Sequence, residues 1–569
     1  MIDFGIWDYG LMALYFAGVL WIGFRTKVND KSHVDYLVAG RSITLPAFVA
    51  TLVSTFYGGI LGVGEFTYNF GVSAWFLYAF PYYFFIIIFA VFLAGRIRKT
   101  KLFTIPDKLE SVYGRKVGVF GAMMVFLLVT PAPYVFMLGI LTQLIFGLPL
   151  TAAMVICLII SVVFLYKGGL TADVRVNIFE FILMFAGFGI ILPFAVLKFG
   201  GLDYLQANLP VQHTTLSGGN SMMFILVWFF MGAWALVDPG FHQRCYAAKS
   251  EKVARKGVFI SLGFWFLFDF MTTLTGLYAV ASIKGLENPA MSYPLLANDI
   301  LPQAAKGFFF IGLLATIMST LHSNLFISAT TLGRDIIGRM KRKERSPQIT
   351  QINSDFFQSK SEEQEEQTRI NTNFTNNKSE ERSPQITQIN SDFFESKSEE
   401  REEQTRINTN FTNNKSEERE EQTRINTNFT NNKSEERSPQ ITQINSDFFE
   451  SKSEERDEGN RYTKIGIVVT SLVSLGIAIL LPSVVRIWYV IGSTTIPALL
   501  IGVVSSYFPR AQAKSAVILS AMIVSFLFSI LWVIFSVGYI EPFFVGVISG
   551  GVIYLFGLIK KHGDTSVKC

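Results

Sequence analysis

The sequence predicts an all-α polytopic membrane protein with thirteen transmembrane helices. Half of the 569 residues are hydrophobic, thirteen stretches are long and apolar enough to cross a bilayer, and lysine and arginine gather in alternate loops between them. A span needs about 20 mostly apolar residues, because every backbone amide in lipid must be satisfied within its own helix. This composition excludes a soluble protein of one ordinary domain.

The predicted spans comprise one first helix, two sets of five and two last helices. In chain order they cover residues 5–24, 44–70, 73–94, 117–146, 148–166, 176–197, 222–245, 257–281, 307–332, 465–481, 487–508, 515–537 and 542–559. The first stretch begins with Asp3 and Asp8 and no basic residue, which favours a retained helix over a signal peptide.

Lysine and arginine indicate the orientation of these spans. One set of alternate loops holds nearly all of them, including Arg175 and Arg244, whereas the other set holds four: Lys198, Lys284, Lys306 and Arg486. Basic loops stay in the cytoplasm. We therefore expect a multi-pass plasma membrane protein with its N-terminus outside and its C-terminus inside, and the basic charge sets topology rather than binding nucleic acid.

Residues 345–456 differ from the rest of the chain. They carry 15 basic and 23 acidic residues and repeat with a period of 37, so that 345–381 recurs as 382–418. Each unit offers too few apolar residues for a continuous core. The pattern favours a disordered cytoplasmic insert of tandem repeats over a partner-docking segment.

The spans and the insert divide the chain into seven parts. These are a first helix with its cytoplasmic loop, the first repeat of five helices, an extracellular loop, three helices of the second repeat, the insert, the last two helices of that repeat, and two C-terminal helices with a tail. Their respective bounds are 1–43, 44–199, 200–221, 222–344, 345–456, 457–508 and 509–569.

Two spans are interrupted near their middle. The second contains four glycines within residues 58–64, and the seventh contains Gly232 followed by Asp238-Pro239-Gly240. Each is the first helix of a set of five, and because five is odd the two sets enter the membrane from opposite sides. An inverted repeat with broken first helices predicts a substrate and ion site at the bilayer midplane.

A polar cluster in the ninth span lies at the same depth as the first break. Thr316, Ser319 and Thr320 share one helical face, and residues 54–57 occupy the middle of span two. Hard cations take oxygen ligands, which unwound backbone carbonyls and hydroxyls supply without formal charge. The alternative is that these hydroxyls bond their own helix or join it to a neighbour.

Four motifs resemble the sodium:solute symporter family, the relatives of the proline, galactose, sialate and pantothenate symporters. They are Asp35-Tyr36-Leu37-Val38-Ala39-Gly40-Arg41-Ser42, Gly168-Gly169-Leu170, Gln243-Arg244 and Ala315-Thr316-Ile317-Met318-Ser319-Thr320. The resemblance covers the chain except the insert. It implies a leucine-transporter-like five-plus-five inverted repeat, with one helix before the core and two after it.

The same resemblance implies a sodium site. Its ligands would be the backbone carbonyls of Ser54, Tyr57 and Thr316, together with the hydroxyls of Ser319 and Thr320. Sodium is then the coupling ion and the one cofactor expected.

The chain departs from the family pattern at three positions. Phe56 stands where several relatives carry Asp or Asn, and Asn177 where many carry an Asp that supports sodium release. Glu180 appears where Gln is usual. It either replaces the missing charge or extends to the headgroups from the cytoplasmic end of its span. Trp234 falls near the substrate-gating aromatic of some relatives, with core packing as the alternative.

Other ionisable residues within the spans suggest no catalysis. Asp238 is expected to cap a helix end, Asp269 has no partner recognisable in the sequence, and His322 either carries protons or bonds a neighbouring helix. No nucleophile, phosphate-binding or metalloprotease motif is present. We therefore expect a transporter and not an enzyme.

The predicted function is sodium-coupled import of a small organic solute by alternating access. The apolar and aromatic lining near Phe56, Tyr57 and Trp234 is compatible with an amino acid, a sugar or a small carboxylate. Two alternatives stay open: a proton-coupled symporter of the same fold with Glu180 as the titrating group, and a transporter-derived sensor or scaffold that signals through the insert.

Overall fold

The computed structural model describes residues 2–26, 32–341, 461–481, 484–535 and 540–566. In this part the regular structure is helical, apart from one isolated bridge between Ile43 and Ala248. Eleven helices there are long and apolar enough to span a membrane, so the all-helical polytopic fold is confirmed. The count of thirteen and the two sets of five remain predictions. The insert predicted for 345–456 lies outside the described residues.

The span-length elements follow the predicted stretches closely. They are α1 (Ile6–Arg25), the continuous helix from η2 (Trp75–Ala79) through α5 (Phe80–Ile88) and η3 (Phe89–Ala94) to α6 (Gly95–Lys99), α8 (Arg115–Leu128) with α9 (Ala132–Phe146), α10 (Leu150–Phe199), α15 (Glu251–Ser282), α17 (Ala305–Thr330), Arg461–Leu480, α22 (Val484–Ser506), α23 (Ser515–Phe535) and α24 (Pro542–Ser566). Shorter helices outside the predicted spans are α2 (His33–Val38), α7 (Ile105–Tyr113), α11 (Leu202–Asn208) and α16 (Ser292–Ile300).

The second predicted span is broken where its glycines lie. It forms α3 (Leu45–Ser54) and α4 (Ile60–Phe70), with non-helical residues between them. A Cβ on Gly58 would stand 2.2 Å from the Cβ of Thr320, and one on Gly59 would stand 1.9 Å from the Trp488 ring. Because these glycines have no Cβ, the side chains of Thr320 and Trp488 can pack directly against the non-helical backbone between α3 and α4.

The seventh predicted span is broken as well. It consists of α12 (Met222–Met231), α13 (Trp234–Val237) and α14 (Pro239–Ala247). Pro239 occupies the first position of α14, where its missing N–H costs nothing, and Asp238 Oδ1 accepts the Phe241 amide at 2.8 Å. The expectation that Asp238 caps a helix end is confirmed.

Predicted spans five and six form one 50-residue element, α10. A straight helix of that length would extend about 75 Å, more than twice the hydrocarbon thickness. Gly169 interrupts it with φ 51° and ψ −147°, and a Cβ there would lie 2.6 Å from the Tyr36 carbonyl. The loop expected between the two spans is thus replaced by a kink at one glycine.

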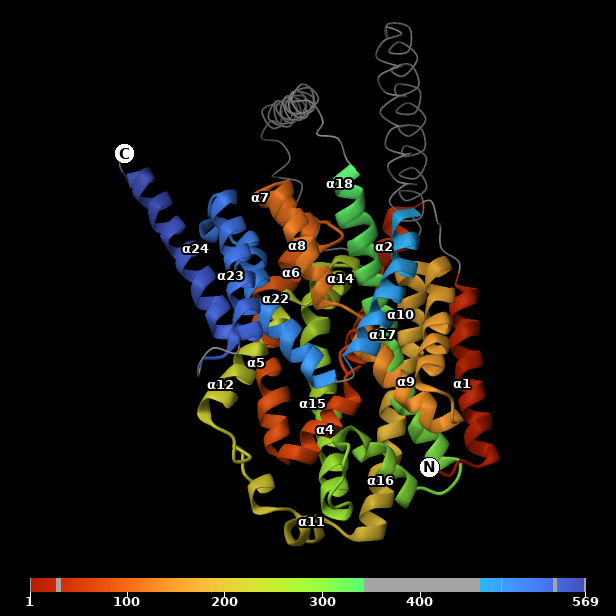
Figure 1. The fold of residues 1–569 in the computed structure, drawn as a ribbon. Coiled ribbons are helices and arrows are strands. Elements are labelled where there is room, and N and C mark those ends of the chain that lie inside the picture. The colour runs from red at the N-terminus through yellow and green to blue at the C-terminus, as the bar shows by residue number, and fades with distance from the viewer. Residues whose placement is uncertain (1, 27–31, 342–460, 482–483, 536–539, 567–569) are drawn as a thin grey trace, which may run out of the picture. The chain divides into compact units, whose positions relative to one another are not determined.

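Helix α17 forms the centre of the bundle and packs along α10 (Figure 1). It is buried almost throughout, whereas only 28%, 28% and 22% of the corresponding stretches of α1, α23 and α24 are buried. Its N-terminus is capped by the buried Asp8 of α1, whose Oδ1 accepts the amides of Ala304 at 2.9 Å and Gly307 at 2.7 Å. A carboxylate at this helix end also complements the helix dipole.

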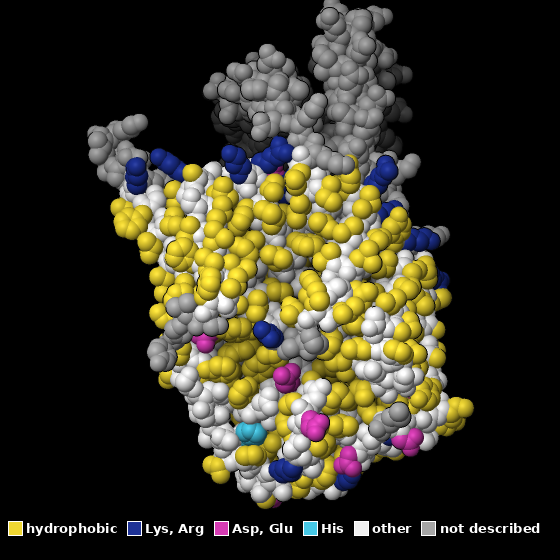
Figure 2. Space-filling model, in the orientation of Figure 1, with side chains coloured by type: hydrophobic (Ala, Val, Ile, Leu, Met, Phe, Trp, Pro, Cys, Tyr) yellow, Lys and Arg dark blue, Asp and Glu magenta, His cyan; other side chains and the backbone are white. Residues whose placement is uncertain are grey.

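In Figure 2 hydrophobic side chains cover most of the surface, and a few charged side chains lie among them in the lower half of the view. Lysine and arginine gather at the end where α18 (Arg339–Lys341) and α24 finish. This distribution is the one that a bilayer-spanning protein with a basic side is expected to have.

The segment that ends at Lys341 is held to α7 by ion pairs. Asp107 Oδ1 lies 3.0 Å from Arg334 Nη1 and 2.5 Å from Arg339 Nη2, and Arg339 Nε lies 2.6 Å from Glu110 Oε2. These contacts fix the last described residues before the insert.

Candidate functional site

The break between α3 and α4 meets the middle of α17 through two hydroxyl groups. Ser319 Oγ donates to the Ser54 carbonyl at 2.8 Å and to the Thr316 carbonyl at 2.9 Å. Thr320 Oγ1 donates to the Thr55 carbonyl at 3.0 Å. Thr55 is half-buried and the other four residues are buried, so carbonyl and hydroxyl oxygens from two distant segments converge in the interior.

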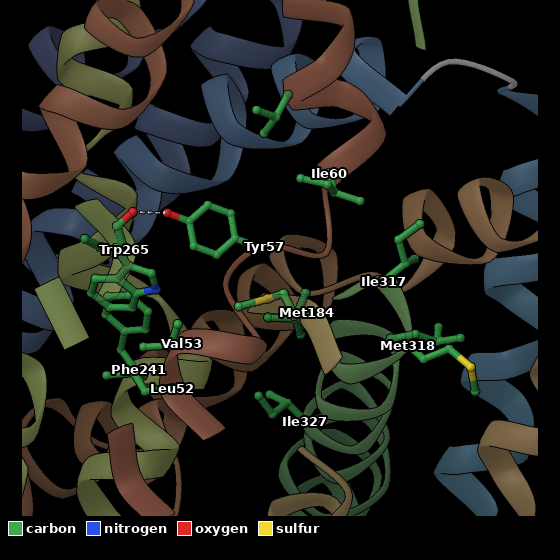
Figure 3. Packing of buried hydrophobic residues seen from close by; sticks show 14 of the residues in the cluster. Leu52, Val53, Tyr57, Ile60, Met184, Phe241, Trp265, Ile317, Met318 and Ile327 are labelled. Atoms are coloured by element: carbon green, nitrogen blue, oxygen red, sulfur yellow. Dashed lines mark hydrogen bonds between the residues drawn. The ribbon is translucent and has the colours of Figure 1, made fainter. Parts of the chain in front are cut away.

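Four of the five residues predicted as sodium ligands are thereby brought together: Ser54, Thr316, Ser319 and Thr320. The fifth, Tyr57, precedes the Gly58 that packs against Thr320. Its side chain points toward Trp265, as Figure 3 shows, and its hydroxyl donates to the Trp265 carbonyl at 2.9 Å. The carbonyl that Thr320 binds belongs to Thr55, which the sequence reasoning did not include.

Asn177 lies one helical turn from this convergence. Its Nδ2 donates to Thr51 Oγ1 on α3 at 3.0 Å and to Ser323 Oγ on α17 at 3.3 Å. Asn177 Oδ1 is buried and has no hydrogen-bond partner among the described residues. A buried amide that ties α10 to both α3 and α17 links the three helices around the polar cluster.

A fully buried ion pair adjoins Asn177. Arg244 Nη2 lies 2.9 Å from Asp173 Oδ2, and both side chains have no exposed surface. Ser323 Oγ lies 2.8 Å from Asp173 Oδ2 and 2.5 Å from Arg244 Nη2, and Gln243 accepts from Arg244 Nη1. The assignment of Arg244 to a cytoplasmic loop was therefore wrong, because its charge is neutralised inside the bundle.

Sequence reasoning missed Asp173, Ser323 and Thr51. The spacing carried a usable signal, since Asp173 precedes Asn177 by four residues and Ser323 follows Ser319 by four, which places each pair on one helical face. The pairing of Asp173 with Arg244 across 71 positions had no local signal.

Glu180 is fully buried between α10, α1 and α17. Tyr15 donates to its Oε1 at 3.0 Å, and His322 Nδ1 lies 4.0 Å from the same oxygen. The interpretation of Glu180 as a side chain that reaches the headgroups is therefore wrong. A buried carboxylate with one short hydrogen bond is costly unless it is protonated or joined by a cation.

Asp269 also gains a partner that the sequence did not reveal. The hydroxyl of Tyr83, from α5, donates to its Oδ2. This bond joins α5 to α15 and gives the buried carboxyl group of Asp269 a structural role.

A cavity opens beside the convergence of α3 and α17, and the space free of protein atoms there, open solvent included, is about 900 Å³. Thr55, Thr320 and Ser323 line it, together with Asp238 and Arg244. Aromatic residues form much of its wall, namely Phe56, Tyr78, Tyr82, Tyr134, Trp228, Trp234, Phe241 and Trp488.

Both aromatic residues predicted for a solute site or gate therefore line this cavity. The Phe56 ring packs at 5.2 Å from Tyr82 and at 5.0 Å from Trp265. Trp234 is half-buried, and its indole approaches Gly492 of α22. Aromatic stacking thus gives the cavity a rigid wall at Phe56, and Trp234 stands where the seventh span is broken.

The chain is similar to known proteins in sequence and in fold. The model of the sodium:solute symporter family matches residues 36–356. The chain is 26% identical to the sodium/glucose cotransporter of Vibrio parahaemolyticus over 58% of its own length and 68% of the relative's. It is 23% identical to the sodium/proline symporter of Staphylococcus aureus over 59% of its own length and 70% of the relative's.

The fold is similar to that of a solved Na+-coupled sialic acid symporter, with a TM-score of 0.68 and 13% identity over 98% of each chain. The family resemblance inferred from the sequence motifs is confirmed. The matched family and relatives are transporters rather than enzymes.

Proposed function

We propose that this chain, which belongs to the sodium:solute symporter family, imports a small organic solute together with sodium by alternating access. The observation that carries the proposal is the pair of contacts across the α3–α4 break, from Ser319 Oγ to the Ser54 carbonyl at 2.8 Å and from Thr320 Oγ1 to the Thr55 carbonyl at 3.0 Å. A sodium ion at this point would be held by oxygen atoms alone, as hard cations prefer.

The proposed ion ligands are Ser54, Tyr57, Thr316, Ser319 and Thr320. In the structure the two hydroxyls donate protons to carbonyl oxygens. A cation would replace these hydrogen bonds, because both hydroxyls can rotate and present their lone pairs. Sodium would then join the open backbone to α17 and favour the state that accepts solute.

The proposed release route passes Asn177 and Glu180. Asn177 bridges Thr51 and Ser323 directly beside the convergence, and Glu180 supplies a buried carboxylate one turn further along α10. The carboxylate of Asp173 is committed to Arg244, which leaves Glu180 as the better candidate to attract a leaving cation.

The orientation follows from charge. We assign the basic end of Figure 2, where α18 and α24 finish, to the cytoplasm. The N-terminus then lies outside, and solute enters the cell together with sodium that moves down its gradient. One sodium crossing about 100 mV with a tenfold gradient releases about 3.7 kcal/mol, enough for a several-hundredfold solute gradient.

Binding of radioactive sodium to the purified chain tests this proposal. We expect the double variant Ser319→Ala/Thr320→Ala to lose at least about tenfold in sodium affinity, because two ligands disappear. The matched control is Ser328→Ala on the same helix, whose buried hydroxyl has no hydrogen-bond partner among the described residues. Unchanged sodium affinity in the double variant, with the control behaving like the parent, would remove the proposed site.

Glu180 favours one second candidate, a proton-coupled symporter. Its carboxyl group is fully buried beside Tyr15 and His322, so in this candidate it would carry the coupling proton in place of a cation. Solute uptake into vesicles driven by a pH gradient in potassium medium would favour this candidate, whereas uptake that requires sodium at constant pH would exclude it.

A further inference from the structure

The charges that face the cavity do not balance. Of its lining side chains, Asp238 and Arg244 carry formal charge. Arg244 forms an ion pair with Asp173 at 2.9 Å and also attracts Asp238, which leaves one negative charge among the three groups. Asp238 forms no ion pair with a described residue, and its Oδ1 accepts the Phe241 amide at 2.8 Å. The cavity wall therefore presents one carboxylate in excess of its cations.

The serine and threonine hydroxyl groups that line the cavity are committed within the protein, and Tyr78, Tyr82 and Tyr134 add phenolic hydroxyls to its lining. Thr55 Oγ1 donates to the Thr51 carbonyl at 2.7 Å, Thr320 Oγ1 to the Thr55 carbonyl, and Ser323 Oγ to Asp173. An organic anion would meet the charge of Asp238 without gaining a free cation in return.

The aromatic wall favours the opposite charge. Ring faces attract a cation within about 6 Å, and each such contact contributes about 0.5–2 kcal/mol, most for tryptophan. Trp234 precedes Asp238 by four residues along the broken span, and Phe56, Tyr82 and Phe241 line the same cavity. A carboxylate and aromatic rings in the wall of one cavity are the combination that suits an alkylammonium group.

We propose that the solute carries a positively charged alkylammonium group, held by Asp238 and by the aromatic rings of this cavity. The inference rests on the proposed function, because it names the solute of that same transport cycle. Relatives that match the chain are named for glucose, proline, choline and sialic acid, so their names do not choose among solutes. The cationic group can belong to a cation such as choline or to a zwitterion such as glycine betaine.

Calorimetric titration of the purified full-length chain tests the proposal. The probes are choline, glycine betaine, glucose and 3,3-dimethyl-1-butanol, which has the shape of choline with carbon in place of the charged nitrogen. We expect choline or glycine betaine to bind in sodium chloride at least about tenfold tighter than the neutral isostere. Preference for choline would identify a cationic solute, and preference for glycine betaine a zwitterionic one.

Two variants sharpen the test. Asp238→Asn keeps the oxygen that caps α14 but removes the charge, so we expect at least about tenfold weaker binding of the ammonium probe and unchanged binding of radioactive sodium. Asp203→Asn, an exposed residue of α11, is the control and should bind the probe like the parent.

The outcomes separate the two proposals. Equal affinity for choline and its neutral isostere, or sodium binding without affinity for either ammonium probe, would overturn the inference and leave sodium coupling intact. Ammonium binding that is the same in sodium and in potassium chloride would support the inference and count against the sodium-coupled function.

Discussion

Replacing Asp173 by asparagine would leave the buried Arg244 guanidinium without the carboxylate that it contacts directly. The two groups lie 2.9 Å apart with no exposed surface, and at an effective dielectric constant of about 20 their attraction is about 6 kcal/mol. Removing one partner of a buried pair costs about 3–5 kcal/mol, because the remaining charge stays desolvated. We therefore expect Asp173→Asn to lower the free energy of unfolding by that amount.

The chain contains a matched control for this measurement. Lys198 and Asp299 also lie 2.9 Å apart, but their side chains are 43% and 51% exposed. An exposed pair contributes about 0–1 kcal/mol, so Asp299→Asn should change stability little. Thermal unfolding midpoints of both variants in the same detergent, with denaturant titration where unfolding is reversible, would compare the two pairs directly.

A double-mutant cycle tests the cause. If the loss comes from a stranded charge, Asp173→Asn combined with Arg244→Met should destabilise by clearly less than the sum of the single changes. Additive effects, or a loss for Asp173→Asn no larger than that for Asp299→Asn, would contradict the view that the pair is held in a low-dielectric interior.

Three further predictions concern a close approach, a helix cap and an ion pair. Gly58→Ala should abolish sodium-dependent solute binding, because the new Cβ would stand 2.2 Å from the Cβ of Thr320. Gly10→Ala is the control: its Cβ would have no atom within 4 Å, so it should bind solute like the parent in the same titration. Asp8→Ala should lower the unfolding free energy by about 1–3 kcal/mol, since two α17 amides lose their acceptor, and Asp8→Asn should lose less. Burial raises the pKa of Asp107, but Arg334 and Arg339 outweigh it and hold that pKa below its usual value. The ionised Asp107 carboxylate therefore contributes its full stabilisation above about pH 4, and this is lost as the pH falls further. Between about pH 5 and pH 3 the thermal midpoint of Asp107→Asn should fall less steeply than that of the parent.

Features with a local cause could be predicted from the sequence. Span lengths follow from apolar runs, and the two broken spans follow from glycine and proline, which fail to sustain a helix in ways that are visible at the residue itself. The cluster of Thr316, Ser319 and Thr320 could be placed on one face because helical periodicity fixes it. The cap provided by Asp238 follows from its position directly before Pro239, the first residue of α14.

Features that depend on distant partners could not be predicted. Tyr15 and Glu180 are 165 positions apart, and Arg244 and Asp173 are 71 apart. A charge count along the chain treats every arginine as solvated, so it assigns Arg244 to a loop. The kink at Gly169 was not predicted either. The polar residues around it suggest a loop between two spans, whereas in the structure the chain turns at this one residue, which packs against the distant Tyr36.

The ion site and the solute cavity share residues, and this offers a physical basis for coupling. Thr320 binds the Thr55 carbonyl of the break and also lines the cavity, as does Thr55 itself. Ser323 lines the same cavity and binds the Asp173–Arg244 pair and Asn177. A sodium ion that draws the break toward α17 would therefore reshape the cavity wall at the same moment. Because coupling is reciprocal, a solute that fits the reshaped wall must tighten sodium by the same factor.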